Sequence, residues 1–135
     1  MNEELIRSAL GVLDNSYAPY SHFHVAAAVL TDTGNVYTGV NVENASYGAT
    51  VCAERVAILK AVSDGKRKGD LKGLHVMVGS GRVGTPCFLC RQTIGEFFDE
   101  DADVVCYSTE GDKKEFKVRD LCPFPFGSED LMQPV

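Results

Sequence analysis

Apolar positions near the start of the chain recur with the period of an α-helix. Behind Asn2, a residue type that favours the N-cap position, the pattern predicts an amphipathic helix over residues 3–14. Pro19 lies beyond the end of this pattern and does not interrupt it. The apolar positions of the predicted helix are Leu5, Ile6, Ala9, Leu10 and Leu13.

Five short segments predict β-strands, four of them from runs of apolar and β-branched residues. The polar residues 31–35 separate the first two runs and predict the turn of a hairpin. A second turn is expected at residues 110–112, before the last segment. The predicted strands cover residues 25–30, 36–40, 74–78, 104–107 and 115–118.

Two more helices are predicted between the later strands. The apolar positions of residues 52–63 fit a helix that is buried on more than one side and ends at Gly65, and residues 90–98 predict another. This order of elements after a hairpin predicts parallel crossover units added to an antiparallel pair. The predicted fold class is α/β, a three-layer α/β/α sandwich with a mixed five-stranded sheet. Open sheets of this kind bind ligands at the carboxyl ends of parallel strands, where these two helices would begin.

Length and composition fit a single domain over residues 1–135. The chain has 135 residues, of which 44% are hydrophobic, enough for one core and too few for two ordinary domains. Lysine and arginine number 13 against 19 aspartate and glutamate residues, which gives a net charge of −6. Because a polyanion would be repelled, nucleic acid is disfavoured as a substrate or partner.

The N-terminal segment has no secretory pattern. Residues 1–13 include Glu3, Glu4 and Arg7, and they lack both an unbroken apolar stretch and a small-residue cleavage site. No segment approaches the roughly 20 apolar residues that span a bilayer. The sequence therefore predicts a soluble, cytoplasmic protein without a membrane partner.

Cysteine usage points to metal binding. Five cysteines, an odd number in a chain with no export signal, argue against a disulfide framework. Cys52, Cys87 and Cys90 have the spacing of metal ligands. Cys106 lies in an apolar run and is expected to be a small core residue, while Cys122, beside a proline, gives no clear signal.

The pattern Cys-x-Glu followed by Pro-Cys-x-x-Cys is the most informative part of the chain. Cys87 and Cys90 would lie on one side of the first turn of a helix, and Cys52 would add a third thiolate from another helix start. Three ligands leave a tetrahedral Zn²⁺ one position for water. Glu54 lies about 200° around the helix from Cys52 and suits the role of proton carrier better than that of ligand. One Zn²⁺ per subunit and hydrolytic deamination of a base are predicted.

Two arginines are predicted to support the thiolates. Arg55 is three residues after Cys52 and Arg91 is four after Cys87, so each shares a helical face with a ligand sulfur. Hydrogen bonds from both guanidinium groups, together with the positive ends of the helices, would offset the negative charge of the thiolates.

A structural zinc site, in a non-catalytic zinc-stabilised binding protein, is the alternative. Such a site would need a fourth protein ligand. The nearest candidates, His75, Cys106 and Cys122, are not at ligand spacing. Glu54 also speaks against this alternative, because a carboxylate beside an unused metal is costly to keep.

Five segments occur together in the order and spacing of a known family. They are residues 20–25, 39–45, 52–55, 86–92 and 126–131. With them, the chain resembles the small cytidine deaminases of free-nucleoside salvage over nearly its whole length. The resemblance implies hydrolysis of cytidine and 2′-deoxycytidine, one zinc ion per subunit, and a homotetramer with shared active sites.

The resemblance also implies roles for residues outside the zinc motif. Asn41 and Glu43 would hold the ribose hydroxyls, a function that suits an amide and a carboxylate, and Phe23 would pack on the base. The Ala53 backbone N–H would meet the pyrimidine edge together with the Glu54 carboxylate. Neighbouring subunits would complete the pocket with Ala45, Tyr47 and Phe126.

Two departures from the family pattern bear on the substrate. Phe88 and Leu89 stand between the paired cysteines where small residues are usual, and Ala26 stands where glycine is usual. Phe88 is expected to narrow or reshape the mouth of the pocket, which leaves a related aminopyrimidine nucleoside such as blasticidin S as an alternative substrate. Polynucleotide editing is disfavoured, because family members that act on tRNA or DNA more often carry histidine at the position of Cys52.

Overall fold

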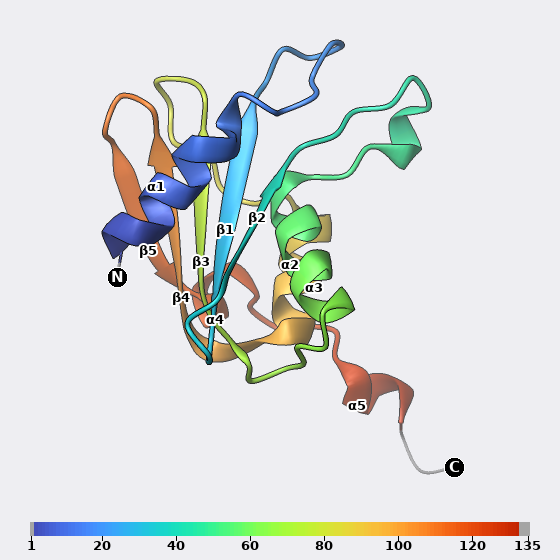
Figure 1. The fold of residues 1–135 in the computed structure, drawn as a ribbon. Helices are drawn as coiled ribbons and strands as arrows, with labels where there is room; N and C mark the ends of the chain where they lie inside the picture. Colours follow the sequence, from blue (N-terminus) through green and yellow to red (C-terminus); the bar gives the residue numbers. More distant parts are fainter. Residues whose placement is uncertain (1, 133–135) are drawn as a thin grey trace.

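The chain folds around one mixed β-sheet with helices on both faces (Figure 1). The computed structural model describes residues 2–132. In chain order the elements are α1 (Asn2–Leu13), β1 (Val25–Thr31), β2 (Val36–Val40), the 3₁₀ helix η1 (Tyr47–Ala49), α2 (Ala53–Ser63), β3 (Leu71–Val78), α3 (Phe88–Phe97), β4 (Phe98–Ser108), β5 (Lys113–Lys117), α4 (Val118–Leu121) and α5 (Ser128–Leu131).

The sheet contains both parallel and antiparallel neighbours, in the order β2-β1-β3-β4-β5. Strand β1 is antiparallel to both β2 and β3, β3 is parallel to β4, and β4 is antiparallel to β5. Strands β2 and β3 therefore run in the same direction on either side of β1. The chain passes through α2 between β2 and β3, and through α3 between β3 and β4, so the predicted crossover units are confirmed.

Successive side chains of the strands point to opposite faces of the sheet and pack into two separate hydrophobic cores. On β1, Ala27 and Val29 join the cluster that α2 and α3 cover, whereas Ala26 and Ala28 join the cluster under α1. Figure 1 shows α1 on one face of the sheet and α2 and α3 on the other, which confirms the three-layer prediction. Ala26, one of the departures from the family pattern, thus faces α1.

Helix α2 lies unusually close to the sheet at Gly39 of β2. A Cβ atom at Gly39 would lie 2.6 Å from both the Ala53 carbonyl oxygen and the Ala57 nitrogen. Only a residue without a side chain fits there, because real Cβ contacts of that length are strongly repulsive. The contact fixes the first turn of α2 against the sheet, directly after Cys52.

The predicted elements are present, with shifts at their ends. Helix α1 begins at Asn2 itself, and α3 begins at Phe88, two residues before its predicted start. Strand β4 extends back to Phe98 through acidic residues that carry no apolar pattern, and it is held there by pairing with Leu71 of β3. The short helices η1, α4 and α5 were not predicted. Within residues 2–132, the helices are too short or too polar to cross a membrane.

Candidate metal centre and active site

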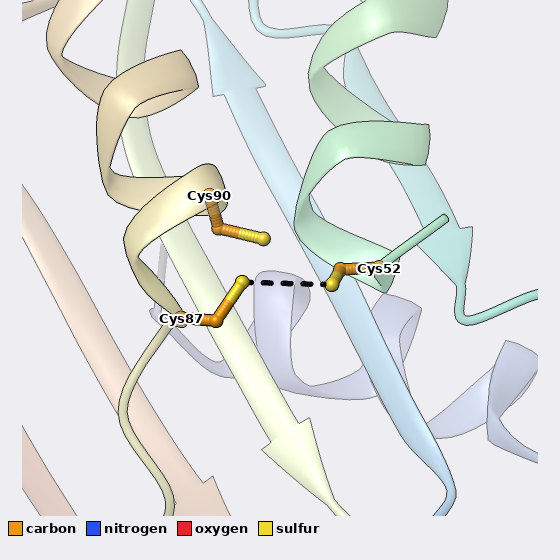
Figure 2. A group of neighbouring side chains, drawn as sticks. All are labelled: Cys52, Cys87 and Cys90. Atoms are coloured by element: carbon orange, nitrogen blue, oxygen red, sulfur yellow. Dashed lines mark hydrogen bonds between the residues drawn. The ribbon is translucent and has the colours of Figure 1, made fainter. Parts of the chain in front are cut away.

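Three cysteine sulfurs meet where α2 and α3 begin. Cys52 is the N-cap of α2 and Cys87 the N-cap of α3, and Cys90 follows in the first turn of α3. Their Sγ atoms all lie within 4.8 Å of one another, and those of Cys52 and Cys87 are 3.7 Å apart. Figure 2 shows the three side chains pointing toward one another across the gap between the two helices. The predicted ligand set is therefore brought together.

The cluster fits a zinc ion with one open position. Two sulfurs bound tetrahedrally at about 2.3 Å from Zn²⁺ lie about 3.8 Å apart, close to the separation of Cys52 and Cys87. Within residues 2–132, no fourth histidine, cysteine or carboxylate joins the group. Cys90 is buried, Cys52 half-buried and Cys87 exposed, so the site opens on the side of Cys87.

Arg55 supports the first ligand as its helical spacing predicts. Its Nη2 donates to the Cys52 sulfur at 3.7 Å and to the Thr50 carbonyl oxygen at 3.4 Å. The Cys90 thiol and, after it, the Arg55 guanidinium lower the pKa of Cys52 to about 5, which favours the thiolate that binds metal. The Arg55 Nε is buried and has no acceptor among the described residues. A buried donor without an acceptor is costly, and negatively charged sulfurs around a metal would supply one.

Arg91 does not take the predicted place beside a sulfur. In the described chain its guanidinium donates to the Pro86 carbonyl oxygen at 2.8 Å, the Thr85 hydroxyl at 3.1 Å and the Leu121 carbonyl oxygen at 3.3 Å. The prediction from helical spacing was wrong in its choice of acceptor. A guanidinium satisfied by three oxygens in fork geometry is held better than one that reaches a weakly accepting sulfur.

Glu54 combines deep burial with an ionisable carboxyl group. It is the second residue of α2 and is 5% exposed. Burial raises the pKa of Glu54 to about 7, and the charge of a Cys52 thiolate adds to this effect. A carboxyl group with a pKa near neutrality can both accept and donate a proton at physiological pH, as a proton carrier must.

A pocket of about 260 Å³ opens in front of the cysteine cluster. Predicted residues that line it are Phe23, Asn41, Glu43, Cys52, Ala53, Glu54 and Cys87. Sequence reasoning missed Ser21, Thr50 and Thr85, which also line it. Each of these lies within two residues of a recognised motif residue, and the hydroxyl side chain was the only signal that could have selected it.

Asn41 holds the segment that leads from Phe23 into β1. Its Oδ1 accepts a hydrogen bond from the Val25 backbone N–H at 3.0 Å, and its Nδ2 donates to the Phe23 carbonyl oxygen at 2.7 Å. Ser16 donates its hydroxyl to the same Oδ1. Because an amide carries two N–H donors, one of them is left for a ligand in the pocket.

Glu43 plays a similar part in the neighbouring turn. Its Oε1 accepts from the backbone N–H groups of Tyr20 at 2.9 Å and Ser21 at 3.1 Å, and its Oε2 accepts from the Ser21 hydroxyl. The Ser21 hydroxyl is the main cause of a lowered pKa at Glu43. The carboxylate is therefore ionised at neutral pH and retains acceptor capacity toward the pocket.

Comparison with known proteins shows to which family this chain belongs. A family model described as the cytidine and deoxycytidylate deaminase zinc-binding region matches residues 1–108. The chain belongs to the cytidine and deoxycytidylate deaminase family. Its cysteine cluster is thus the zinc-binding site of a deaminase fold.

Similarity to individual members of this family extends over nearly the whole chain. A cytidine deaminase from Halalkalibacterium halodurans is 42% identical over 127 residues, 94% of this chain and 95% of the relative. A probable cytidine deaminase from Dictyostelium discoideum is 42% identical over 137 residues, covering 98% and 90%. The crystal structure of a cytidine deaminase from Burkholderia pseudomallei matches with a TM-score of 0.89 and 38% identity, covering 93% of this chain and 99% of the other.

Three residues that the family resemblance assigns to the pocket lie outside this chain's own pocket. They are Ala45, Tyr47 and Phe126. Tyr47 is 77% exposed on a projecting segment and makes an edge contact with the Tyr20 ring. Phe126 is half-exposed, and its carbonyl oxygen accepts from the Gln92 side chain at 2.9 Å. Their contribution from neighbouring subunits stays a prediction.

Phe88 lies away from the mouth of the deaminase pocket. Its ring is 79% exposed and sits 4.7 Å from the Arg91 guanidinium carbon. It lines a different cavity, of about 300 Å³, together with Phe124 and Phe126. Within this chain Phe88 therefore does not line the pocket, because the first turn of α3 directs this side chain toward the C-terminal segment. Its effect on a pocket completed by neighbouring subunits stays a prediction.

Proposed function

We propose that this protein is a zinc-dependent hydrolase that deaminates cytidine and 2′-deoxycytidine to the corresponding uridines, with release of ammonia, in pyrimidine salvage. The observation that carries the proposal is the placement of Glu54, a buried carboxyl group with a pKa of about 7, beside three convergent cysteine sulfurs at one pocket. Membership of the deaminase family supports the same reaction.

The residues of this chain divide the work of the reaction. A zinc ion held by Cys52, Cys87 and Cys90 would supply activation of the attacking water. The Glu54 carboxylate takes a proton from that water and delivers it to ring N3 as the new C4–O bond forms. It then takes the remaining proton from the C4 hydroxyl and passes it to the amino group, so that the C4 carbonyl forms, the C4–N bond breaks and ammonia departs. The carboxyl group is restored at the end of each cycle.

Groups farther from the sulfurs orient the nucleoside. Asn41 and Glu43 line the outer part of the same pocket and bind the sugar hydroxyls with their remaining donor and acceptor capacity. Phe23 packs on the pyrimidine ring, and the Ala53 backbone N–H meets its edge. The negative charge at Glu43 disfavours a phosphate on the sugar, which selects free nucleosides over nucleotides.

The functional unit is proposed to be a cytoplasmic homotetramer of single-domain subunits, each with one zinc ion. The exposed rings of Phe88, Phe124 and Phe126 line one cavity on the isolated chain, which supports a shared site because contiguous exposed apolar patches mark interaction surfaces. No nucleic acid or membrane partner is proposed, since the net charge is −6.

Substitution of Glu54 by glutamine tests the reaction. Glu54→Gln should retain zinc and lose activity on cytidine by at least about 100-fold, because proton transfer by a positioned side chain typically contributes 10²–10⁴-fold. Ammonia release and loss of the cytidine absorbance measure activity, and metal analysis of the same sample measures zinc. Full activity of this variant would exclude the proton-carrier role.

Matched controls and a substrate panel complete the test. Glu96→Gln, an exposed glutamate of α3, should keep wild-type activity. The panel comprises cytidine, 2′-deoxycytidine, cytidine 5′-monophosphate and blasticidin S. Turnover of blasticidin S alone would replace the proposed substrate. Bound zinc with no turnover of any compound would support a non-catalytic binding protein.

A further inference from the structure

Arg91 connects the loop before Cys87 with the C-terminal segment that follows α4. Its Nε and Nη2 donate to residues immediately before the ligand Cys87, namely to the Pro86 carbonyl oxygen and the Thr85 hydroxyl. Its Nη1 donates to the carbonyl oxygen of Leu121, the last residue of α4. One guanidinium group thus joins the ligand loop to the start of the C-terminal segment.

The ligand loop has few other polar tethers. Within the described chain, residues 80–86 make no backbone–backbone hydrogen bond. Cys87 has extended backbone dihedral angles and precedes the first residue of α3, so the helix does not fix residues 85–86. Two of the three Arg91 hydrogen bonds therefore determine how this loop delivers the Cys87 sulfur to the cluster.

Further hydrogen bonds hold the C-terminal segment against α3 beside Arg91. The Cys122 thiol donates to the Arg91 carbonyl oxygen at 3.2 Å, and Gln92 donates to the Phe126 carbonyl oxygen at 2.9 Å. The exposed Phe88 ring lies against the guanidinium, with its centroid 4.7 Å from the guanidinium carbon, and adds a cation–π contact to Arg91. Phe88 thereby belongs to the support of the zinc site.

We propose that Arg91 is a positioning residue that sets the geometry of the zinc site by clamping Pro86–Cys87 onto the C-terminal segment. Because the three acceptors diverge, the clamp depends on the planar fork of arginine as well as on its charge. The effect on catalysis rests on the deamination proposed above, whereas the effect on zinc retention does not.

Zinc release into a chromogenic chelator tests the clamp directly. Arg91→Gln and Arg91→Lys should both release zinc about 10–100-fold faster than the wild type, the usual cost of losing a group that orients a metal ligand. Lysine cannot reach three divergent acceptors, so it should fail to rescue. Wild-type release by Arg91→Lys would show that charge alone matters and would overturn the clamp, as would wild-type release by Arg91→Gln.

The matched control is Arg67, which spans two backbone carbonyl oxygens in another loop. It donates to Val62 at 3.0 Å and to Lys66 at 2.8 Å. Arg67→Gln should leave zinc release unchanged. Accelerated release in this control would mean that loss of any loop arginine loosens the metal, which would overturn a specific role for Arg91.

Two further measurements keep the proposal decidable. If Arg91→Gln does not fold, Thr85→Val tests the proposal by removing a single acceptor of Arg91. It should accelerate zinc release about two- to fivefold, less than the 10–100-fold expected when all three hydrogen bonds are lost. An unchanged release rate would contradict the proposal. In cytidine turnover, Arg91→Lys should lower kcat and change KM less than threefold, since the clamp acts on the metal site. If the wild type turns over no cytosine nucleoside, the zinc measurements still decide the role of Arg91.

Discussion

Each face of the sheet buries a titratable side chain whose pKa burial shifts in favour of the neutral form, Glu54 on one face and His75 on the other. On the face covered by α2 and α3, called here the site face, burial raises the pKa of Glu54 to about 7. On the face covered by α1, burial lowers the pKa of His75 to about 4. Glu54 is 5% exposed and His75 is 2% exposed. Burial alone therefore does not distinguish a functional group from a structural one.

The difference lies in where each group finds its partner. A ring nitrogen of His75 is 3.0 Å from the Tyr107 hydroxyl, and the two rings stack with centroids 5.5 Å apart. Glu54 instead lines a pocket beside the Cys52 sulfur. A buried polar pair that satisfies itself contributes to the fold, whereas a buried carboxyl group directed at a cavity is available to a substrate.

The largest expected difference is between two buried cysteines of the site face, the zinc ligand Cys90 and the core residue Cys106. Cys90→Ala removes a ligand and should abolish stoichiometric zinc binding and lower activity by more than the roughly 100-fold cost of losing a supporting residue. Cys106→Ala changes the same residue type in the core of that face and should cost only about 1 kcal/mol of stability. Metal analysis and cytidine turnover measure both variants. Zinc loss by Cys106→Ala would break the distinction between site and core.

Glycine substitutions compare the two faces by packing. Gly39→Ala places a Cβ against the α2 backbone on the site face and should lower the free energy of unfolding by about 1–3 kcal/mol. Gly73→Ala adds the same atom to β3, where the nearest atom is the Asp103 carbonyl oxygen at 3.9 Å, and should be neutral or slightly stabilising. Urea denaturation of the two variants measures the difference. A Gly39→Ala variant as stable as Gly73→Ala would show that α2 can move away from the sheet.

The last comparison is the pH dependence of stability that His75 contributes on the α1 face. Because the pKa of His75 is lowered from 6.5 to about 4 by folding, the unfolded chain binds more protons between these values, and stability falls as the pH drops through this window. The shift corresponds to at most about 3 kcal/mol. His75→Gln should lose less stability than the wild type between pH 7.5 and pH 4.5, measured by urea denaturation.

Activity provides the control for that experiment. His75→Gln should keep the wild-type kcat on cytidine at pH 7.5, since the ring lies on the face away from the pocket. An altered kcat would show that the α1 face communicates with the site, and the comparison between the faces would then fail.

Local chemistry made most of the architecture predictable from sequence. Runs of apolar and β-branched residues predicted four of the strands, helical spacing predicted α1 and α2, and Gly65 ends α2 with φ of 101° as expected for a helix terminus. The first half of β4 was not predictable, because its polar residues carry no apolar pattern and its pairing with β3 is made by Phe98 with Leu71 and by Asp103 with Gly73. Tertiary context overrides local preference at such positions.

The two arginines near the site also show what local sequence predicts and what depends on tertiary contacts. Arg55 and Arg91 follow a ligand cysteine at helical spacing, yet only Arg55 donates to a sulfur. Spacing on a helix places a side chain on a face, but its acceptor depends on which distant segment packs there. For Arg91 that segment includes Leu121, thirty residues away in sequence, which no local pattern could indicate.

The amino-acid sequence by itself determined the zinc ligands and singled out Glu54 as the proposed proton carrier. Their residue types and their spacing at helix starts leave few other arrangements, because a metal ion accepts only particular donors at fixed geometry. The tertiary structure alone decided which groups support those ligands and where Phe88 lies. Orientation, burial and pKa depend on contacts between segments that are distant in the chain, and these contacts form only when the sheet and its two helical layers are assembled.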